Sequence, residues 1–400
     1  MNLIPGIKRK SAWILLILFP FLMSCHKDTE VTPAFKPTLY TIQIPKFFPT
    51  KLNIPDDNPM TVEGIRLGRY LFYDGRLSGR THPDSLMSCS SCHTQSSAFE
   101  PGINNTRFPG GKTFGLTGIA TPHYALPLMN LVFNSNGYLW NGMIHSSNTK
   151  LGNTAYGIPA LPQYNYKNLE SLVWMAIAAP HEINGSIEKT VQLIGSDPMY
   201  PPMFKAAFGT SEINIDRISK AIAQFVRTLI SSNSKFDKYL RGESSLTPEE
   251  LMGYNLFTTE EGADCFHCHG GGGNPLFSTY LFYNNGKDTQ FNDPRDRFSI
   301  TQNPVDKGAY KAPSLRNIEF TAPYMHDGRF KNLDEVIDFY SEGVILTQYT
   351  SPLMHHAQNQ GAQLTPTEKQ QLKAFLKTLS DQQFITDTSF SKPSDLNWQK

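Results

Sequence analysis

The sequence Cys-x-x-Cys-His occurs twice in this chain of 400 residues, beginning at Cys89 and at Cys265. The motif is typical of a covalent c-type haem site, in which the two thiols bind the haem vinyl groups and the histidine becomes an axial ligand of the iron. This spacing restricts the fold strongly, because two sulfurs and one imidazole must reach different parts of one rigid porphyrin. The residues predicted to hold the haems are Cys89, Cys92 and His93 for the first, and Cys265, Cys268 and His269 for the second.

Two cysteine pairs can also bind one zinc ion or form two small disulfides. Three features favour haem instead. Each pair is followed directly by a histidine, the pairs lie in different halves of the chain, and the one other cysteine, Cys25, belongs to an N-terminal leader. Zinc ligands usually lie close together in the sequence. We therefore expect one haem in each of two domains; the alternative, a zinc-stabilised structural protein, would purify without colour.

Length and composition are those of a water-soluble protein with room for two hydrophobic cores. The chain has 400 residues, 39% of them hydrophobic, and a net charge of +1. A chain of this length is commonly divided into two domains. Its basic residues are scattered and no nucleic-acid motif is present, so nucleic acid is not an expected partner.

The N-terminus has the pattern of an export signal. Basic residues at positions 8–10 precede an apolar run at 12–23, which is too short to span a bilayer comfortably. The following Leu-Met-Ser-Cys, ending at Cys25, resembles a bacterial lipobox, so we expect lipidation of Cys25 and membrane attachment through the lipid alone. The alternative is an ordinary cleaved signal peptide. Export to a Gram-negative cell envelope, facing the periplasm or the cell surface, agrees with haem attachment outside the cytoplasmic membrane.

The remainder of the chain is predicted to be helical with long loops. Apolar residues between 218 and 229 recur at spacings of three and four, which is the pattern of one helix face. Thr247-Pro-Glu-Glu and Thr365-Pro-Thr-Glu are capping boxes with proline at the first helical position, so a helix should begin at each. We find no sustained alternation that would indicate strands.

These patterns predict an all-α fold of two cytochrome c-like helical domains, each with one covalent c-type haem, joined by long loops. The boundary is expected between the helix that contains residue 218 and the one that begins after Thr247. The predicted segments are a lipoprotein signal peptide (1–24), a Pro-rich tether (25–57), a first haem domain (58–242), a second haem domain (243–385) and a tail (386–400).

Several stretches resemble the bacterial di-haem cytochrome c peroxidases and their methylamine-utilisation relatives. The most specific is Pro-Ser-Leu-Arg-Asn at 313–317 followed by Thr-Ala-Pro-Tyr-Met-His-Asp-Gly at 321–328. Residues 68–78 and 139–142 are similar to further family segments, and the resemblance runs from about residue 58 to 379. It implies that the first haem reacts with peroxide and that the second transfers electrons.

The implied function is the reduction of hydrogen peroxide to water, with electrons from a small cytochrome c or cupredoxin. One alternative keeps the haems and changes the substrate: a related enzyme oxidises aromatic side chains of a partner protein through high-valent iron. A second alternative is a non-catalytic di-haem electron-transfer lipoprotein, which would carry two six-coordinate haems and would not react with peroxide.

The resemblance also implies roles for two residues beside the first haem. Trp140 matches a tryptophan that lies between the two haems and helps electrons cross; the alternative for it is ordinary core packing. Residues 179–184 resemble the segment that carries the catalytic carboxylate, which makes Glu182 the expected acid and base in peroxide cleavage. The alternatives are that Glu182 is a surface helix-cap residue, or that Glu100, near the same haem, has this role.

The expected sixth ligands follow from the same resemblance. Many family members have a histidine that caps the first haem at rest, and that position falls near Leu116 here. We expect an open first haem with His93 as its proximal ligand, and His123 is the alternative sixth ligand. At the second haem, bound by His269, Tyr340 occupies the position of the usual methionine. An anionic phenolate should lower the iron potential; the alternative ligands there are Met354 and Met325.

The family also holds a calcium ion between its domains. The resemblance implies that the backbone carbonyls of Thr321 and Pro323 are two of its donors. The family's asparagine ligand falls near Tyr124, so one donor is missing, although carbonyls and water can still bind calcium. The expected cofactors are two covalent haem c groups, with one calcium ion as a further candidate.

Overall fold

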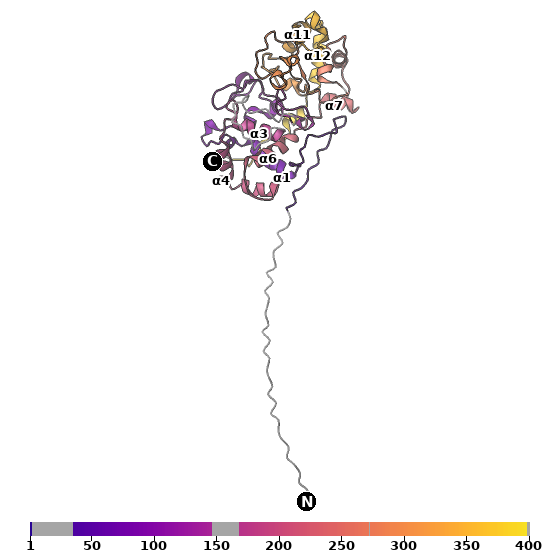
Figure 1. Cartoon of the computed structure of the whole chain (residues 1–400). Coiled ribbons are helices and arrows are strands. Elements are labelled where there is room, and N and C mark those ends of the chain that lie inside the picture. The colour runs from indigo at the N-terminus through magenta and orange to yellow at the C-terminus, as the bar shows by residue number, and fades with distance from the viewer. Residues whose placement is uncertain (2–34, 146–167, 272, 398–400) are drawn as a thin grey trace. The chain divides into compact units, whose positions relative to one another are not determined.

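The computed structural model of the chain describes Met1 and residues 35–145, 168–271 and 273–397 (Figure 1). The described residues from 36 onward form one compact unit. The longer helices are α1 (Val62–Tyr73), α3 (Leu169–Ala178), α4 (Ile187–Ser196), α5 (Tyr200–Phe208), α6 (Ile215–Arg227), α8 (Pro248–Thr258), α11 (Leu333–Glu342) and α12 (Pro366–Lys377). The shorter ones are α2 (Cys89–Cys92), α7 (Lys235–Leu240), α9 (Phe266–His269), α10 (Phe298–Thr301) and α13 (Gln382–Thr386).

Strand structure is minimal in the described part of the chain. β1 (Phe282–Tyr283) pairs antiparallel with β2 (Tyr310–Lys311), and this pair forms the one sheet. The mostly helical fold expected from the sequence is confirmed. Both capping boxes also form, with Thr247 accepting a hydrogen bond from the Glu250 amide at the start of α8 and Thr365 accepting one from the Glu368 amide at the start of α12.

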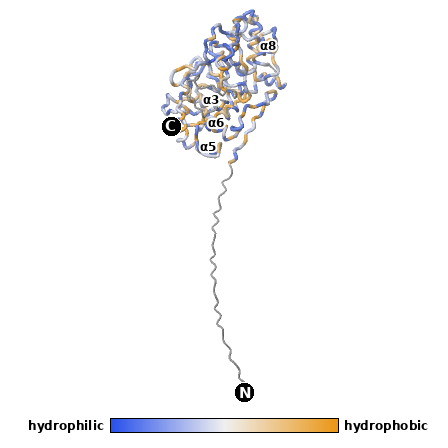
Figure 2. The backbone as a smooth tube through the Cα atoms, in the orientation of Figure 1, coloured by the Kyte–Doolittle hydropathy of each residue, from blue (hydrophilic) through white to orange (hydrophobic). Residues whose placement is uncertain are grey.

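Two hydrophobic cores form around the two haem motifs. The first is built mainly from α1, α3, α5 and α6, and the cysteines of the first motif pack against it. The second is built mainly from α7, α8, α11 and α12, and Cys265 packs against it. Figure 2 shows hydrophobic stretches around the labelled helices α3 and α6 of the first core. Each core therefore surrounds one Cys-x-x-Cys-His sequence.

The same close helix crossing occurs in both cores. In the first, α1 packs on α6 so closely that a Cβ atom on Gly68 would lie 1.9 Å from the carbonyl oxygen of Ala221. In the second, α8 packs on α12, and a Cβ atom on Gly253 would lie 1.9 Å from the carbonyl oxygen of Gln371. Only glycine permits such an approach. The repeated crossing makes the two cores structurally alike.

Buried ion pairs fix segments that are far apart in the sequence. The Arg227 guanidinium, at the end of α6, donates to both carboxylate oxygens of Glu170 in α3, at 2.5 and 3.0 Å. In the second core, the Arg316 guanidinium pairs with Asp237 of α7, and both side chains are almost fully buried. Buried charges of this kind must be paired, because an isolated one would be very costly.

Part of the segment predicted as a tether packs on the folded unit. Ile42 and Phe48 are buried in a third cluster, together with Phe133, Leu276 and Tyr280. The proline content of residues 25–57 indicated an extended segment, but it gave no sign that two apolar side chains would bury themselves. Ile42 and Phe48 of the predicted tether therefore belong to the folded unit.

Near the ends of the predicted domains, some residues pack in a core other than that of their predicted domain. Phe236 of α7 belongs to the second core, although the predicted boundary falls after residue 242. In the predicted tail, Leu396 is buried in the first core, and the Tyr70 hydroxyl donates to Asp395. Among the described residues, every helix is too short or too polar to cross a membrane.

Candidate functional site

Each Cys-x-x-Cys-His sequence opens into its own cavity. The first cavity has an empty volume of about 1560 Å³ and is lined by Cys89, Cys92 and His93. The second has an empty volume of about 1380 Å³ and is lined by Cys265, Cys268 and His269. Most of the other lining side chains are apolar in both. The two cavities are therefore similar in size and in chemistry.

The histidines of both motifs are prepared to bind a metal through Nε2. His93 Nδ1 lies 2.7 Å from the carbonyl oxygen of Phe99, and His269 Nδ1 lies 3.1 Å from that of Pro313. A carbonyl oxygen can only accept, so Nδ1 carries the proton and Nε2 keeps its lone pair. Burial lowers the pKa of both imidazoles to about 4, so both are neutral at pH 7.

The thiols fit covalent haem better than zinc or disulfides. All four cysteines of the motifs are free, and burial raises the pKa of each thiol, to about 12 for Cys89 and Cys268. The pairs open into different cavities and cannot share one ion. In the described part of the chain, the groups that could hold a metal ion contain no cysteine. Two thiols and one imidazole on the wall of a large apolar cavity are the residues that a c-type haem requires.

Glu182 lies on the wall of the first cavity. It belongs to the turn after α3, which is held in place by the Thr117 hydroxyl donating to the carbonyl oxygen of Pro180 at 2.7 Å. Burial raises the pKa of the Glu182 carboxyl to about 7. Glu100 is also buried, and burial raises its pKa well above the usual range, but it does not line this cavity. Of the two carboxyls, Glu182 is the one placed to act there.

Trp140 lines both cavities. Its indole Nε1 donates to the carbonyl oxygen of Tyr124 at 2.7 Å, and its own carbonyl accepts from the Lys311 amide at 2.7 Å. These two bonds hold the ring between the cavities. Trp140 therefore borders both cavities.

Lys311 also faces both cavities, and sequence reasoning missed it. Its Nζ donates to the carbonyl oxygens of Asn136 and Tyr280, at 3.2 and 3.3 Å, and lies 4.5 Å from the centre of the Phe282 ring. Burial, reinforced by the charge of Arg297, lowers the pKa of this ammonium group to about 7. A single lysine, here at the end of the two-residue strand β2, has no spacing signal, so the sequence could not indicate it.

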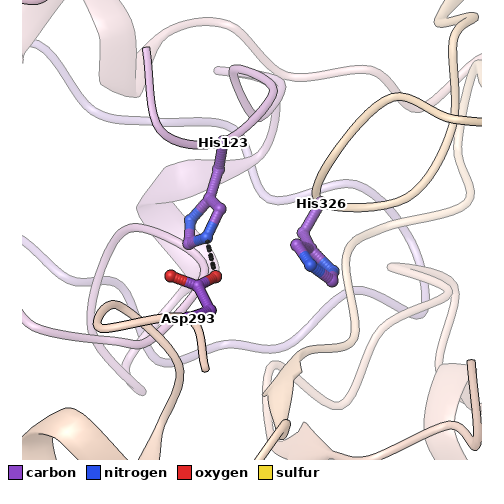
Figure 3. Close-up of side chains that lie close together, drawn as sticks. All are labelled: His123, Asp293 and His326. Carbon is purple, nitrogen blue, oxygen red and sulfur yellow. Dashed lines mark hydrogen bonds and ion pairs between the residues drawn. The ribbon is translucent and has the colours of Figure 1, made fainter. Parts of the chain in front are cut away.

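A polar cluster lies beside Trp140, formed by His123, Asp293, Tyr310 and His326. Asp293 Oδ2 lies 2.6 Å from His123 Nε2, a pairing visible in Figure 3, and it accepts a 2.6 Å hydrogen bond from the Tyr310 hydroxyl. Tyr310 stacks on His326 with ring centres 3.6 Å apart. The contacts of Asp293 with His123 and Tyr310 hold the pKa of its carboxyl well below the usual range, against the effect of burial. His123 faces the first cavity, whereas Tyr310 and His326 face the second.

The second cavity contains all three candidate ligands for its distal side: Tyr340, Met325 and Met354. Tyr340 lies on α11, and its hydroxyl oxygen accepts a hydrogen bond from Asn285 Nδ2 at 3.1 Å. Burial raises the pKa of the phenol, and the Asn285 amide opposes that effect. Tyr340, the ligand that the family resemblance implies, therefore lines the second cavity, and Asn285 holds its hydroxyl group by a hydrogen bond.

The residues expected to hold calcium do not fit that ion well. The Tyr124 hydroxyl, near the expected asparagine position, accepts from the Gly102 amide at 3.0 Å and lies 3.4 Å from the carbonyl oxygen of Ala322. Burial raises the pKa of this phenol, so it stays neutral. Calcium sites rely on carboxylate and amide or carbonyl oxygens. A neutral phenol therefore stands where the family has an amide oxygen, beside the expected carbonyl donors of Thr321 and Pro323. Cys25, the predicted lipidation site, lies outside the described residues.

Comparison with known proteins gives consistent results. A sequence model described as di-haem cytochrome c peroxidase matches residues 62–245. Cytochrome c551 peroxidase of Nitrosomonas europaea is 33% identical over 285 residues, which are 70% of this chain and 73% of that protein. Methylamine utilization protein MauG of Methylorubrum extorquens is 31% identical over 333 residues, 83% of this chain and 82% of that protein. A crystal structure described as a MauG-like protein associated with microbial copper homeostasis is 35% identical, with a TM-score of 0.71, and covers 88% of this chain and 99% of its own.

Proposed function

The chain belongs to the family of di-haem cytochrome c peroxidases, and we propose that it reduces hydrogen peroxide to water with electrons from a small redox protein. Haem c, when bound by both motifs, supplies the iron that reacts with peroxide and exchanges electrons. The chain's own contribution is to hold two such groups in separate apolar cavities, to move protons in the first cavity and to separate the two with one aromatic side chain.

The observation that carries the proposal is Glu182 in the first cavity. A carboxyl with a pKa of about 7 is present in both protonation states near neutral pH. It can therefore take a proton from peroxide and return it to the departing oxygen, which is general acid and base catalysis by one group. Burial in an apolar wall is the physical cause of this pKa, as in other tuned catalytic carboxyls.

The test is substitution of Glu182 by glutamine in the protein matured with both haems. We expect peroxide turnover to fall by about 10²–10⁴-fold, the usual contribution of a positioned acid and base. The matched control is Glu100→Gln, which changes a buried carboxyl that does not line the cavity and should leave turnover within a few-fold. Equal losses in both variants, or none in Glu182→Gln, would refute the role.

We also propose that Trp140 carries electrons between the centres and that the first centre keeps an open coordination position. The ring of Trp140 faces both cavities, which supports the first part. The second is supported by His123, the alternative sixth ligand, whose Nε2 lies 2.6 Å from Asp293 and is held by that carboxylate. A ferric spectrum of two wholly six-coordinate haems would contradict the open position.

A second candidate function is oxidation of aromatic side chains on a partner protein. Tyr340 in the second cavity favours it, because a phenolate ligand lowers the iron potential and disfavours easy reduction by a high-potential cytochrome. Turnover with reduced cytochrome c supports the peroxidase. Peroxide-dependent loss of tryptophan or tyrosine in a co-purifying partner, measured by mass spectrometry, supports the alternative.

A further inference from the structure

A cluster of two histidines and two carboxylates lies at the second haem motif, and two of its members, Asp264 and His355, also line the second cavity. His267 occupies the variable position between Cys265 and Cys268. His355 begins a short 3₁₀ helix (His355–Asn359), and Glu260 follows the end of α8. Each of Glu260, His267 and His355 offers one ligand atom, and these atoms lie within 4.8 Å of one another. The three residues come from separate segments, so the fold and not sequence proximity brings them together.

Asp264 lies against both imidazoles of this cluster. Its Oδ1 lies 2.5 Å from His267 Nδ1, and its Oδ2 lies 3.0 Å from His355 Nδ1. A carboxylate that accepts a hydrogen bond from the Nδ1–H group of a histidine fixes the ring tautomer and leaves Nε2 free to bind a metal. This is the usual arrangement around a metal-binding histidine. Asp264 does this here for His267, whereas its Oδ2 lies close to His355 without a hydrogen bond.

Asp264 has three properties that a simple surface ion pair does not require. Its side chain is only 5% exposed, and its Oδ2, although close to His355, forms no hydrogen bond of acceptable geometry. Its backbone φ is 53°, in the left-handed region that few residues other than glycine adopt. Exposed ion pairs contribute little to stability, so they do not account for a buried carboxylate held in this conformation.

The spacing of the ligand atoms suits one ion. His267 Nε2 lies 3.5 Å from Glu260 Oε1. Two atoms that each bind a tetrahedral zinc ion at about 2.0–2.1 Å lie about 3.4 Å from each other. The His267 and His355 rings meet edge to face with their centres 4.9 Å apart, and the His267 and His355 side chains are 20% and 39% exposed. An ion can therefore enter from solvent, with water as its fourth ligand.

We propose that Glu260, His267 and His355 form a binding site for one divalent transition-metal ion of the zinc or copper class, with Asp264 as the positioning residue. Imidazole nitrogen is the donor that such ions prefer, whereas magnesium and calcium prefer sites made of oxygen alone. The site places the ion at the segment that attaches the second haem, because His267 lies between the two cysteines of that motif.

The test measures bound zinc in the full protein matured with both haems. After exposure to zinc and dialysis, elemental analysis of the wild type should give one zinc ion for every two haem irons, after subtraction of the zinc that the histidine variants retain. His267→Ala and His355→Ala should each lose that zinc. Asp264→Asn should bind about 10–100-fold more weakly, the usual effect of removing a carboxylate that orients a metal ligand.

His82→Ala is the matched control, because His82 is an exposed histidine 3.7 Å from a carboxylate oxygen of Asp84 but belongs to no such cluster. It should retain zinc like the wild type. An unchanged haem spectrum shows that a variant has matured and folded, and His355→Ala keeps the test valid if His267→Ala does not mature. Copper(II) should displace the zinc and magnesium should not. Equal zinc in wild type and both histidine variants, no retained zinc, or displacement by magnesium would overturn the proposal.

Discussion

At the scale of single residues, the position of Glu182 predicts how activity depends on pH. Burial raises the pKa of this carboxyl to about 7 in the folded protein. The free enzyme needs the ionised form to accept a proton, so kcat/KM for peroxide should be constant above about pH 8. It should fall about tenfold for each pH unit below about pH 6. A profile with its midpoint near 4.5, the ordinary value for glutamate, would contradict this.

Tyr340 predicts a spectroscopic effect confined to one haem. If its phenol binds the second iron, Tyr340→Phe should change the spectrum of that haem and raise its midpoint potential, because an anionic ligand is removed. The first haem should keep its spectrum. Met354→Leu is the matched control in the same cavity. An unchanged spectrum in Tyr340→Phe, together with a changed one in Met354→Leu, would transfer the assignment to the methionine.

Sequence reasoning could locate some of these residues but not others. Cys89, Cys92 and His93 were predictable because haem attachment fixes their spacing, and Trp140 and Glu182 because they lie in segments that resemble the family's. Asp293, Tyr310 and Lys311 were missed. Their positions depend on contacts between segments far apart in the sequence, such as that of Asp293 with His123, and no local pattern predicts such contacts.

At the scale of helices, the close crossings predict a difference in stability between two glycine substitutions. Gly68→Ala would place a methyl group 1.9 Å from a backbone oxygen of α6. Overpacking of this kind costs about 1–3 kcal/mol, so thermal and denaturant unfolding should both shift toward lower stability. Gly195→Ala, in α4, is the control, because the nearest atom would lie 3.8 Å away. It should leave stability unchanged or raise it by up to about 1 kcal/mol. Equal effects of the two substitutions would contradict the crossing.

The helices were also the part of the fold that the sequence predicted best. The capping boxes at Thr247 and Thr365 are local, and the apolar face of α6 follows from spacing alone; both are confirmed. The packing of Ile42 and Phe48 was not predictable, since their partners Phe133, Leu276 and Tyr280 lie 85 (133 − 48) to 238 (280 − 42) residues farther along the chain. Contacts of that kind depend on tertiary structure rather than on local pattern.

At the scale of the whole molecule, we predict that the enzyme is exported and anchored through Cys25. Cys25→Ala should abolish incorporation of labelled fatty acid and move the protein from the membrane to the soluble fraction of the cell envelope. Ser24→Ala is the control, because a small residue is retained before the cysteine. A Cys25→Ala protein that stays with the membrane would indicate another means of attachment.

The residues between the two cavities affect how substitutions in this enzyme must be interpreted. Trp140, Lys311 and Pro313 line both cavities, so they form a common partition between them. A substitution in this partition changes both cavities at once, so its effect on activity cannot be assigned to one cavity alone. Effects of paired changes, one on each side, should then fail to add. Coupling between the two redox centres would then depend on residues of this partition, including Trp140 and Lys311, without any movement of the surrounding helices.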